Sequence, residues 1–119
     1  MASPDCSGYF FLFAEIGGRT VAYACYGPIA CTVGSYDLYW IAVHTDYQRH
    51  GLGKLLMQAT EERIAQAGGR RVYIETSGRP QYEPTQRFYE RCGYDAEAVL
   101  AEFYAPGDPK IVYSKALAL

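Results

Sequence analysis

One segment in the middle of the sequence constrains the fold more than any other. Tyr36–Val43 is rich in aromatic and β-branched residues with little polar alternation, which is typical of a strand covered on both faces. Apolar residues then recur at helical spacing from Leu52 to Ala67, and two glycines follow as the expected stop. Arg71–Thr76 again has the pattern of a strand. Because a helix separates the two strands, we predict that they run parallel in one sheet.

The flanking segments predict more strands and a second helix. Tyr9–Glu15 and Thr20–Tyr26 predict a β-hairpin, since a glycine pair lies between them. Glu83–Cys92 is predicted as a short helix, with a proline in its first turn and a glycine after its end. Glu97–Tyr104 and Lys110–Ala116 are predicted as strands around an Ala-Pro-Gly-Asp turn. The expected fold is α/β (α+β mixed): a mixed, mostly antiparallel sheet with a central parallel pair and helices packed on it.

Length and composition narrow the class of protein. The chain has 119 residues, half of them hydrophobic, and a formal net charge of −2, which predicts a single domain over residues 1–119 and argues against disorder. We expect no nucleic-acid partner and no membrane partner, because there is no basic run and no apolar run long enough to span a bilayer. The four cysteines lack the spacing of a zinc or redox site. They favour small buried side chains in a reducing compartment, so we expect a cytoplasmic location.

A glycine-containing turn connects the first parallel strand to the helix. It reads Gln48-Arg49-His50-Gly51-Leu52-Gly53-Lys54. Glycines let backbone N–H groups approach a ligand, and a helix N-terminus adds partial positive charge, so the turn suits a pyrophosphate. It is neither a Walker A loop nor a Rossmann turn, because Leu55 follows the lysine and Leu56 stands where a third glycine is needed. The structural alternative is a plain strand-to-helix turn.

Two motifs together resemble one family. Gln48-Arg49-x-Gly51-x-Gly53 is similar to the Gln/Arg-x-x-Gly-x-Gly/Ala signature of the GNAT superfamily of N-acetyltransferases. The segment from Arg87 to Tyr94 resembles that family's Phe-Tyr-x-x-x-Gly-Phe/Tyr segment, and the likeness covers about Tyr9 to Leu117. It implies acetyl transfer from acetyl-CoA to an amine by direct attack in a ternary complex, with acetyl-CoA as co-substrate and no metal.

The resemblance also implies which residues hold the cofactor. The pantetheine arm is expected along Ile41, Ala42 and Val43. The pyrophosphate is expected on Gln48, Arg49, His50, Gly51, Leu52, Gly53 and Lys54, with further contacts from Thr85 and Phe88. A splay between the two parallel strands would admit the thioester. One departure is Tyr82, which stands where many members have an asparagine that contacts the cofactor.

The chemistry needs an acid and a base. An aliphatic amine of pKa near 10.4 is only about 1 in 2,500 neutral at pH 7, a cost of roughly 4.6 kcal/mol, so a base assists. Tyr89 matches the family tyrosine that faces the CoA sulfur and is the predicted acid; its alternative is core packing. Glu75, at the end of the second parallel strand, is the predicted base, and its alternative is a solvated carboxylate. Asp37 on the first parallel strand is the reserve base.

Three functions remain open at this point. The first is N-acetylation of a small or amino-acid-like amine, and the second is N-terminal or lysine acetylation of a protein. The third is an acetyl-CoA sensor or interaction module without catalysis, because only Met1–Gly8 precede the hairpin where GNAT domains usually have a strand and two helices. An N-terminally short domain is expected to expose an apolar strip, which favours a homodimer.

Overall fold

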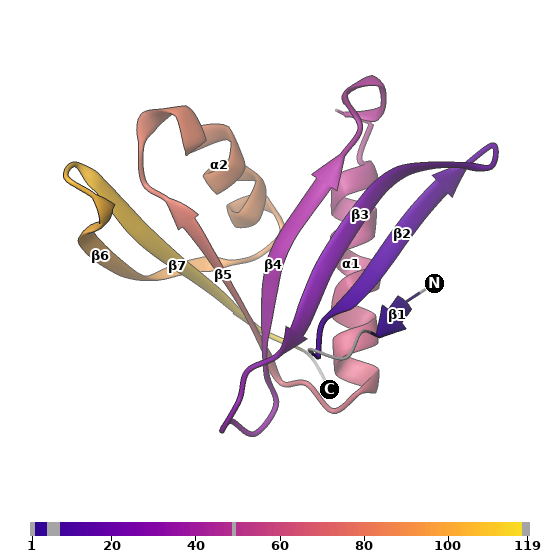
Figure 1. The fold of residues 1–119 in the computed structure, drawn as a ribbon, viewed down its shortest axis with the longest axis horizontal. Helices are drawn as coiled ribbons and strands as arrows, with labels where there is room; N and C mark the ends of the chain where they lie inside the picture. The colour runs from indigo at the N-terminus through magenta and orange to yellow at the C-terminus, as the bar shows by residue number, and fades with distance from the viewer. Residues whose placement is uncertain (1, 5–7, 49, 118–119) are drawn as a thin grey trace.

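The computed structural model describes residues 2–4, 8–48 and 50–117, and seven strands in this part of the chain form one sheet (Figure 1). In sequence these are β1 (Ala2–Pro4), β2 (Phe10–Ile16), β3 (Arg19–Pro28), β4 (Ser35–Val43), β5 (Arg71–Ser77), β6 (Asp95–Ala105) and β7 (Asp108–Ala116). Their spatial order is β1-β2-β3-β4-β5-β7-β6. Helix α1 (Leu52–Gln66) joins β4 to β5, and helix α2 (Glu83–Arg91) lies between β5 and β6. Short 3-10 turns at Thr45–Tyr47 and Pro80–Tyr82 precede the helices.

The predicted fold class is confirmed. β4 and β5, which precede and follow α1 in the sequence, run parallel, and the other neighbouring strands pair antiparallel. The predicted elements form, with ends that move by one or two residues. The sequence did not predict β1, which pairs with β2, because three residues are too short to show a period of two.

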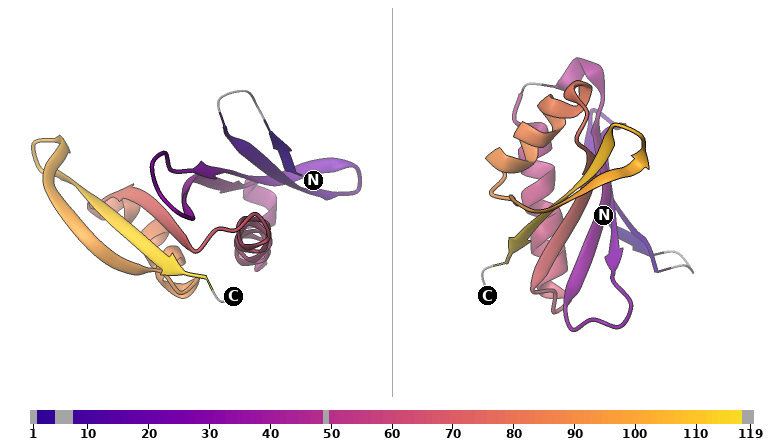
Figure 2. Two further views of the ribbon diagram at one scale, coloured as in Figure 1. Left: turned by 90° about the horizontal axis from the view of Figure 1, so that it is seen from below. Right: turned by 90° about the vertical axis from the view of Figure 1, so that its left-hand side faces the viewer.

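Both helices cover the same face of the sheet (Figure 2). An apolar stripe on α1 is confirmed at Leu56 and Ile64, which are buried. Leu55, predicted from its spacing to belong to the stripe, is instead 62% exposed, and the helix buries Met57 and Thr60. Side chains from alternate strand positions meet this stripe and α2 in one core. Its buried members include Leu12, Ala24, Tyr26, Leu38, Val72, Ile74 and Tyr113 from the strands, and Leu56, Met57, Ile64 and Tyr89 from the helices.

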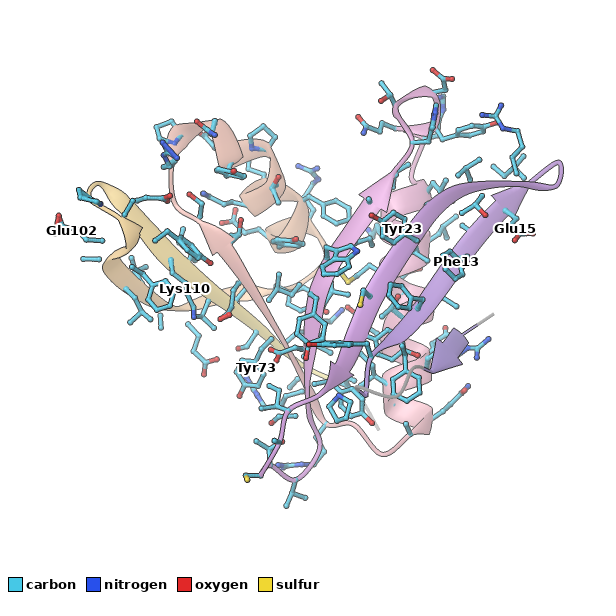
Figure 3. All side chains as sticks on the ribbon, in the orientation of Figure 1. Phe13, Glu15, Tyr23, Tyr73, Glu102 and Lys110 are labelled. Atoms are coloured by element: carbon cyan, nitrogen blue, oxygen red, sulfur yellow. The ribbon has the colours of Figure 1, made fainter. Side chains whose placement is uncertain are left out.

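The opposite face of β2–β5 carries no helix among the described residues, and we call it the open face. Its side chains alternate with those of the core: Phe11, Phe13, Tyr23, Asp37, Trp40, Tyr73 and Glu75. Phe13 is 41% exposed and Trp40 is 47% exposed. Figure 3 looks onto this face, with Phe13, Tyr23, Tyr73 and Lys110 labelled. An exposed apolar strip of the expected kind is therefore present.

The parallel strands part soon after they meet. Their pairing is limited to Ser35 with Arg71, Tyr36 with Val72, and Asp37 with Tyr73. Beyond this point β4 stays paired with β3 and β5 stays paired with β7, so the two strands diverge toward their carboxyl ends (Figure 1). The predicted splay is thus present, and the carboxyl ends of the parallel strands are where open α/β sheets place their ligands.

Candidate functional site

A cleft of about 590 Å³ lies on the helix-covered side, beside the diverging part of β4. It is bounded by the end of β4, by the glycine turn with the start of α1, and by one side of α2. Its lining residues are Ile41, Val43, Gln48, Gly51, Gly53, Lys54, Pro84, Thr85, Phe88, Tyr89 and Arg91. The structure therefore brings most of the predicted site residues to one cavity, of a size that suits a small-molecule ligand.

The two glycines of the turn have different structural roles. Gly51 caps α1 in the left-handed region with φ of 77°, a conformation that L side chains rarely adopt. Gly53 gives the space: a Cβ there would lie 3.2 Å from Cε1 and 3.3 Å from Cζ of Phe88 across the cleft. Gln48 ties the turn to the strand, because its side-chain amide donates to the carbonyl of Val43 at 3.0 Å. The turn thus leaves the start of α1 open to a ligand.

The start of α1 is suited to an anion. The first N–H groups of a helix have no partner within the helix, and the helix dipole places partial positive charge there. Lys54 lines the cleft from the same turn, and Arg91 lines it from α2. Backbone donors and two cations on opposite walls can hold a phosphate group.

Tyr89 is the buried polar group of the cleft. It is only 6% exposed, and its ring packs among those of Phe88, Tyr94 and Tyr113 at centroid distances of 5.8–6.5 Å. Its hydroxyl has no hydrogen-bond partner among the described residues, although the side chain lines the cleft. Burial raises its pKa, with a smaller contribution from Cys92, so the phenol keeps its proton and is available as a donor.

The two candidate carboxylates lie on the open face. Glu75 is exposed, and its carboxylate pairs with Nζ of Lys110 at 2.5 Å. Asp37 is partly buried and belongs to the last pair before β4 and β5 diverge. Burial raises the pKa of Asp37, and the charge of Glu75 raises it further, while Lys110 acts in the opposite direction. Neither carboxylate lines the cleft, so they border the splay from the side opposite Tyr89.

Other predicted residues lie away from the cleft lining. Ala42 alternates with Ile41 and Val43, so its side chain faces the open side of the sheet. Leu52 packs against the core, and His50 is exposed. Arg49 lies outside the described residues. Each of these residues was predicted to bind the cofactor. Because backbone atoms can bind a cofactor as well as side chains, the assignments stay predictions.

Two residues of the lining, Pro84 and Arg91, were not predicted from the sequence. A signal for Arg91 existed, because it follows Phe88 by three residues and Pro84 by seven, which places all three on one side of a helix. In the part of the chain that the structure describes, no three His, Cys, Asp or Glu side chains gather in a way that would hold a metal. Neither described helix is long and apolar enough to cross a membrane.

Comparisons with known proteins agree with this geometry. A model of the acetyltransferase (GNAT) family matches residues 2–94. The crystal structure of a candidate acetyltransferase of the GNAT family from Desulfovibrio desulfuricans is 49% identical, with a TM-score of 0.92 over 94% of this chain and 70% of that chain. No curated protein matches the chain.

More distant structures share the fold. An aminoglycoside 6'-N-acetyltransferase complexed with coenzyme A is 19% identical, with a TM-score of 0.83 over 96% of this chain and 76% of that one. The ribosomal-protein-S18-alanine N-acetyltransferase from Escherichia coli is also 19% identical, with a TM-score of 0.80 over 97% of this chain and 73% of that one. At this identity the likeness concerns the architecture alone, and two such different acceptors on one fold leave the acceptor to be argued from this chain's own residues.

Proposed function

Because the chain belongs to the acetyltransferase (GNAT) family, we propose that it moves an acetyl group from acetyl-CoA to a primary amine of a small or amino-acid-like acceptor. The observation that carries this proposal is the position of Tyr89, whose ring is packed in the core and whose side chain lines the cleft that the glycine turn keeps open. Its phenol hydroxyl can therefore donate a hydrogen bond to a ligand in the cleft.

The residues of the cleft fit acetyl-CoA. The glycine turn with Lys54 and Arg91 suits the pyrophosphate, and the diverging edge at Ile41 and Val43 leaves backbone groups for the pantetheine arm. A Cβ at Gly53 would fill part of this space. When bound, acetyl-CoA supplies a thioester that a neutral amine can attack.

Tyr89 serves in this proposal as the acid. Its raised pKa keeps the proton on Oη, and a CoA thiolate has a basicity close to that of a cysteine thiolate, near pKa 8.5. A neutral phenol is therefore a sufficient donor at the sulfur position. Backbone N–H groups of the diverging part of β4, beyond Asp37, are available to stabilise negative charge on an acyl oxygen.

A carboxylate of the open face serves as the base. Glu75 is the residue predicted from the sequence, but its carboxylate is already paired with Nζ of Lys110. Asp37 has no ion-pair partner among the described residues, and its raised pKa makes it the better acceptor of a proton. We therefore propose Asp37 as the base and keep Glu75 as the competing assignment.

The test follows CoA thiol release with acetyl-CoA and a panel of primary amines. Amine-dependent release is expected, and Asp37→Asn is expected to lower kcat/KM about 10- to 100-fold, more than Glu75→Gln. The larger loss in Glu75→Gln would assign the base to Glu75. Saturable acetyl-CoA binding with no release for any amine would favour a sensor or interaction module.

Protein acceptors are the second enzymatic alternative. The open face exposes aromatic side chains over several strands, which suits a peptide as well as a small amine. Peptides with a free N-terminus or an internal lysine, added to the same assay, separate the two. A preference for peptides over every small amine would replace the small-acceptor proposal.

We also propose a homodimer in the cytoplasm. The exposed Phe13 and Tyr23 on β2 and β3 support self-association through that part of the open face. Light scattering at several concentrations tests the dimer, and a monomer throughout would contradict it. A fluorescent fusion tests the location.

A further inference from the structure

The charged side chains on the open face and beside it on β7 come from three strands. Asp37 lies on β4 and Glu75 on β5, while Lys110 lies on β7, two residues from Val112, the partner of Glu75. Aromatic side chains surround them, with Tyr39 and Trp40 on β4 and Tyr73 on β5. The face thus combines two carboxylates and one ammonium group with apolar surface. Arg71 on β5 adds a guanidinium, which lies 5.8 Å from the ring centroid of Tyr73 and donates to the hydroxyl of Ser114.

Lys110 is held in place by two partners. Its Nζ pairs with a carboxylate oxygen of Glu75 at 2.5 Å and lies 4.1 Å from the ring centroid of Phe103. The lysine side chain is only 14% exposed. An ammonium group between a carboxylate and an aromatic face is favourably placed, so its positive charge is a fixed part of this surface.

The remaining acidic groups of this region are accounted for. Asp108 accepts from the hydroxyl of Ser77 and pairs with Arg79 at 3.6 Å. Glu102 lies at the far end of the β6–β7 hairpin in Figure 3, away from β4. Near the splay, within the described residues, Asp37 is therefore the carboxylate without an ion-pair partner.

We propose that Lys110 determines acceptor specificity: it neutralises Glu75 and repels a second cation, so that the face accepts amines with one ammonium group on an apolar segment. This inference rests on the proposed acetyl transfer. The single ammonium pairs with Asp37, and the apolar segment lies on the aromatic surface that includes Trp40. A diamine of the same length brings a second ammonium toward Lys110, where like charge disfavours it.

The test compares two amines of equal length, pentylamine and 1,5-diaminopentane. The native protein is expected to favour the monoamine about tenfold in kcat/KM, and Lys110→Met is expected to bring the ratio close to one. Lys110→Arg keeps the charge and most of the preference. Arg63→Met is the matched control, because it removes one positive charge from the exposed side of α1 and leaves the ratio unchanged.

A binding measurement without turnover gives an independent readout. Trp40 is the single tryptophan of the chain and lies on the open face, so its fluorescence should respond to amine binding. The ratio of the two dissociation constants should follow the kinetic ratio. If Lys110→Met does not fold, the native protein is measured at two salt concentrations instead. Its preference for pentylamine should shrink between 0.1 and 1 M KCl, because the Debye length falls from about 10 to 3 Å.

The outcomes separate this inference from the function on which it rests. Turnover of both amines with equal efficiency, or a native preference that neither Lys110→Met nor salt reduces, would overturn the role of Lys110 and leave the acetyltransferase proposal standing. Absence of turnover and of any fluorescence response, with every amine and variant, would overturn both.

Discussion

The helix-covered side of the sheet and its open face are built differently. On the helix-covered side, Tyr89 is buried, a Cβ at Gly53 would lie only 3.2 Å from the ring of Phe88, and the cleft lies between α1 and α2. On the open face, Phe13 and Trp40 are about half exposed, and the charged groups lie at the surface. Dense packing fixes the geometry of the proposed cofactor cleft, whereas the exposed face, the proposed acceptor site, is less constrained.

This difference is consistent with one fold that serves many acceptors. A cofactor that is the same in every reaction can be held by a site whose backbone and core are one unit. An acceptor that varies is bound by exposed side chains, which change at little cost in stability. Substitutions on the helix-covered side should therefore have large effects on cofactor binding or folding, and those on the open face should have smaller effects, mainly on the acceptor.

The largest effect is expected from Gly53→Val. The new side chain would press against the ring of Phe88 and fill the space between α1 and α2. We expect acetyl-CoA affinity to fall at least 300-fold, about 3.4 kcal/mol, as measured by calorimetry. Leu55→Val on the exposed side of the same helix is the control. Unchanged affinity in Gly53→Val would place the cofactor elsewhere.

Alkaline pH should destabilise the helix-covered side. Burial raises the pKa values of Tyr89, Tyr94 and Tyr113, and burial with the hydrogen bond to Glu90 raises that of Tyr113 to about 12. A raised pKa means that the folded state retains a proton that the unfolded state loses. The contribution of these protonated tyrosines to the free energy of unfolding is thus complete below pH 10 and is lost as the pH rises toward 12. Each group loses about 1.4 kcal/mol of this contribution per pH unit.

Urea unfolding between pH 8 and 12 measures this loss. In Tyr113→Phe the free energy of unfolding should fall by about 2 kcal/mol less over this pH range than in the native protein, because one titrating group is removed. Phe13→Leu on the open face is the control, because it replaces an aromatic side chain without removing an ionisable group. A native protein whose stability is the same at pH 8 and 11 would contradict the tight burial of these tyrosines.

The sequence predicted the helix-covered side far better than the open face. The glycine turn and the Phe88-Tyr89 pair are recognisable in the sequence. The backbone geometry of the turn and the binding of one cofactor require particular residues at particular spacings. The pairing of Glu75 with Lys110 joins residues on two strands, so no local pattern marks it. Arg91 was missed although helical spacing places it beside Phe88, because a basic residue in a last helical turn has an ordinary structural explanation.

Tyr89→Phe separates chemistry from binding within the cleft. The substitution removes a hydroxyl with no partner among the described residues and keeps the packed ring. The folding equilibrium constant and the acetyl-CoA dissociation constant should therefore stay within about twofold of the native values. Turnover should fall about 10- to 100-fold, because the proton donor is lost. Steady-state kinetics with acetyl-CoA titrations measure both quantities. An equal loss of turnover and affinity would make Tyr89 a structural residue.

The smallest effect is expected from Trp40→Ala. Because the indole is 47% exposed on the open face, its removal should cost less than about 1 kcal/mol, while Leu56→Ala in the core should cost about 2–5 kcal/mol. The acceptor KM should rise about three- to tenfold with kcat nearly unchanged, since apolar contact with the amine is lost. Urea unfolding and amine kinetics on both variants give the comparison. A loss for Trp40→Ala as large as that for Leu56→Ala would mean that the indole is covered in solution, and a dependence of that loss on protein concentration would identify the cover as a second copy of the chain.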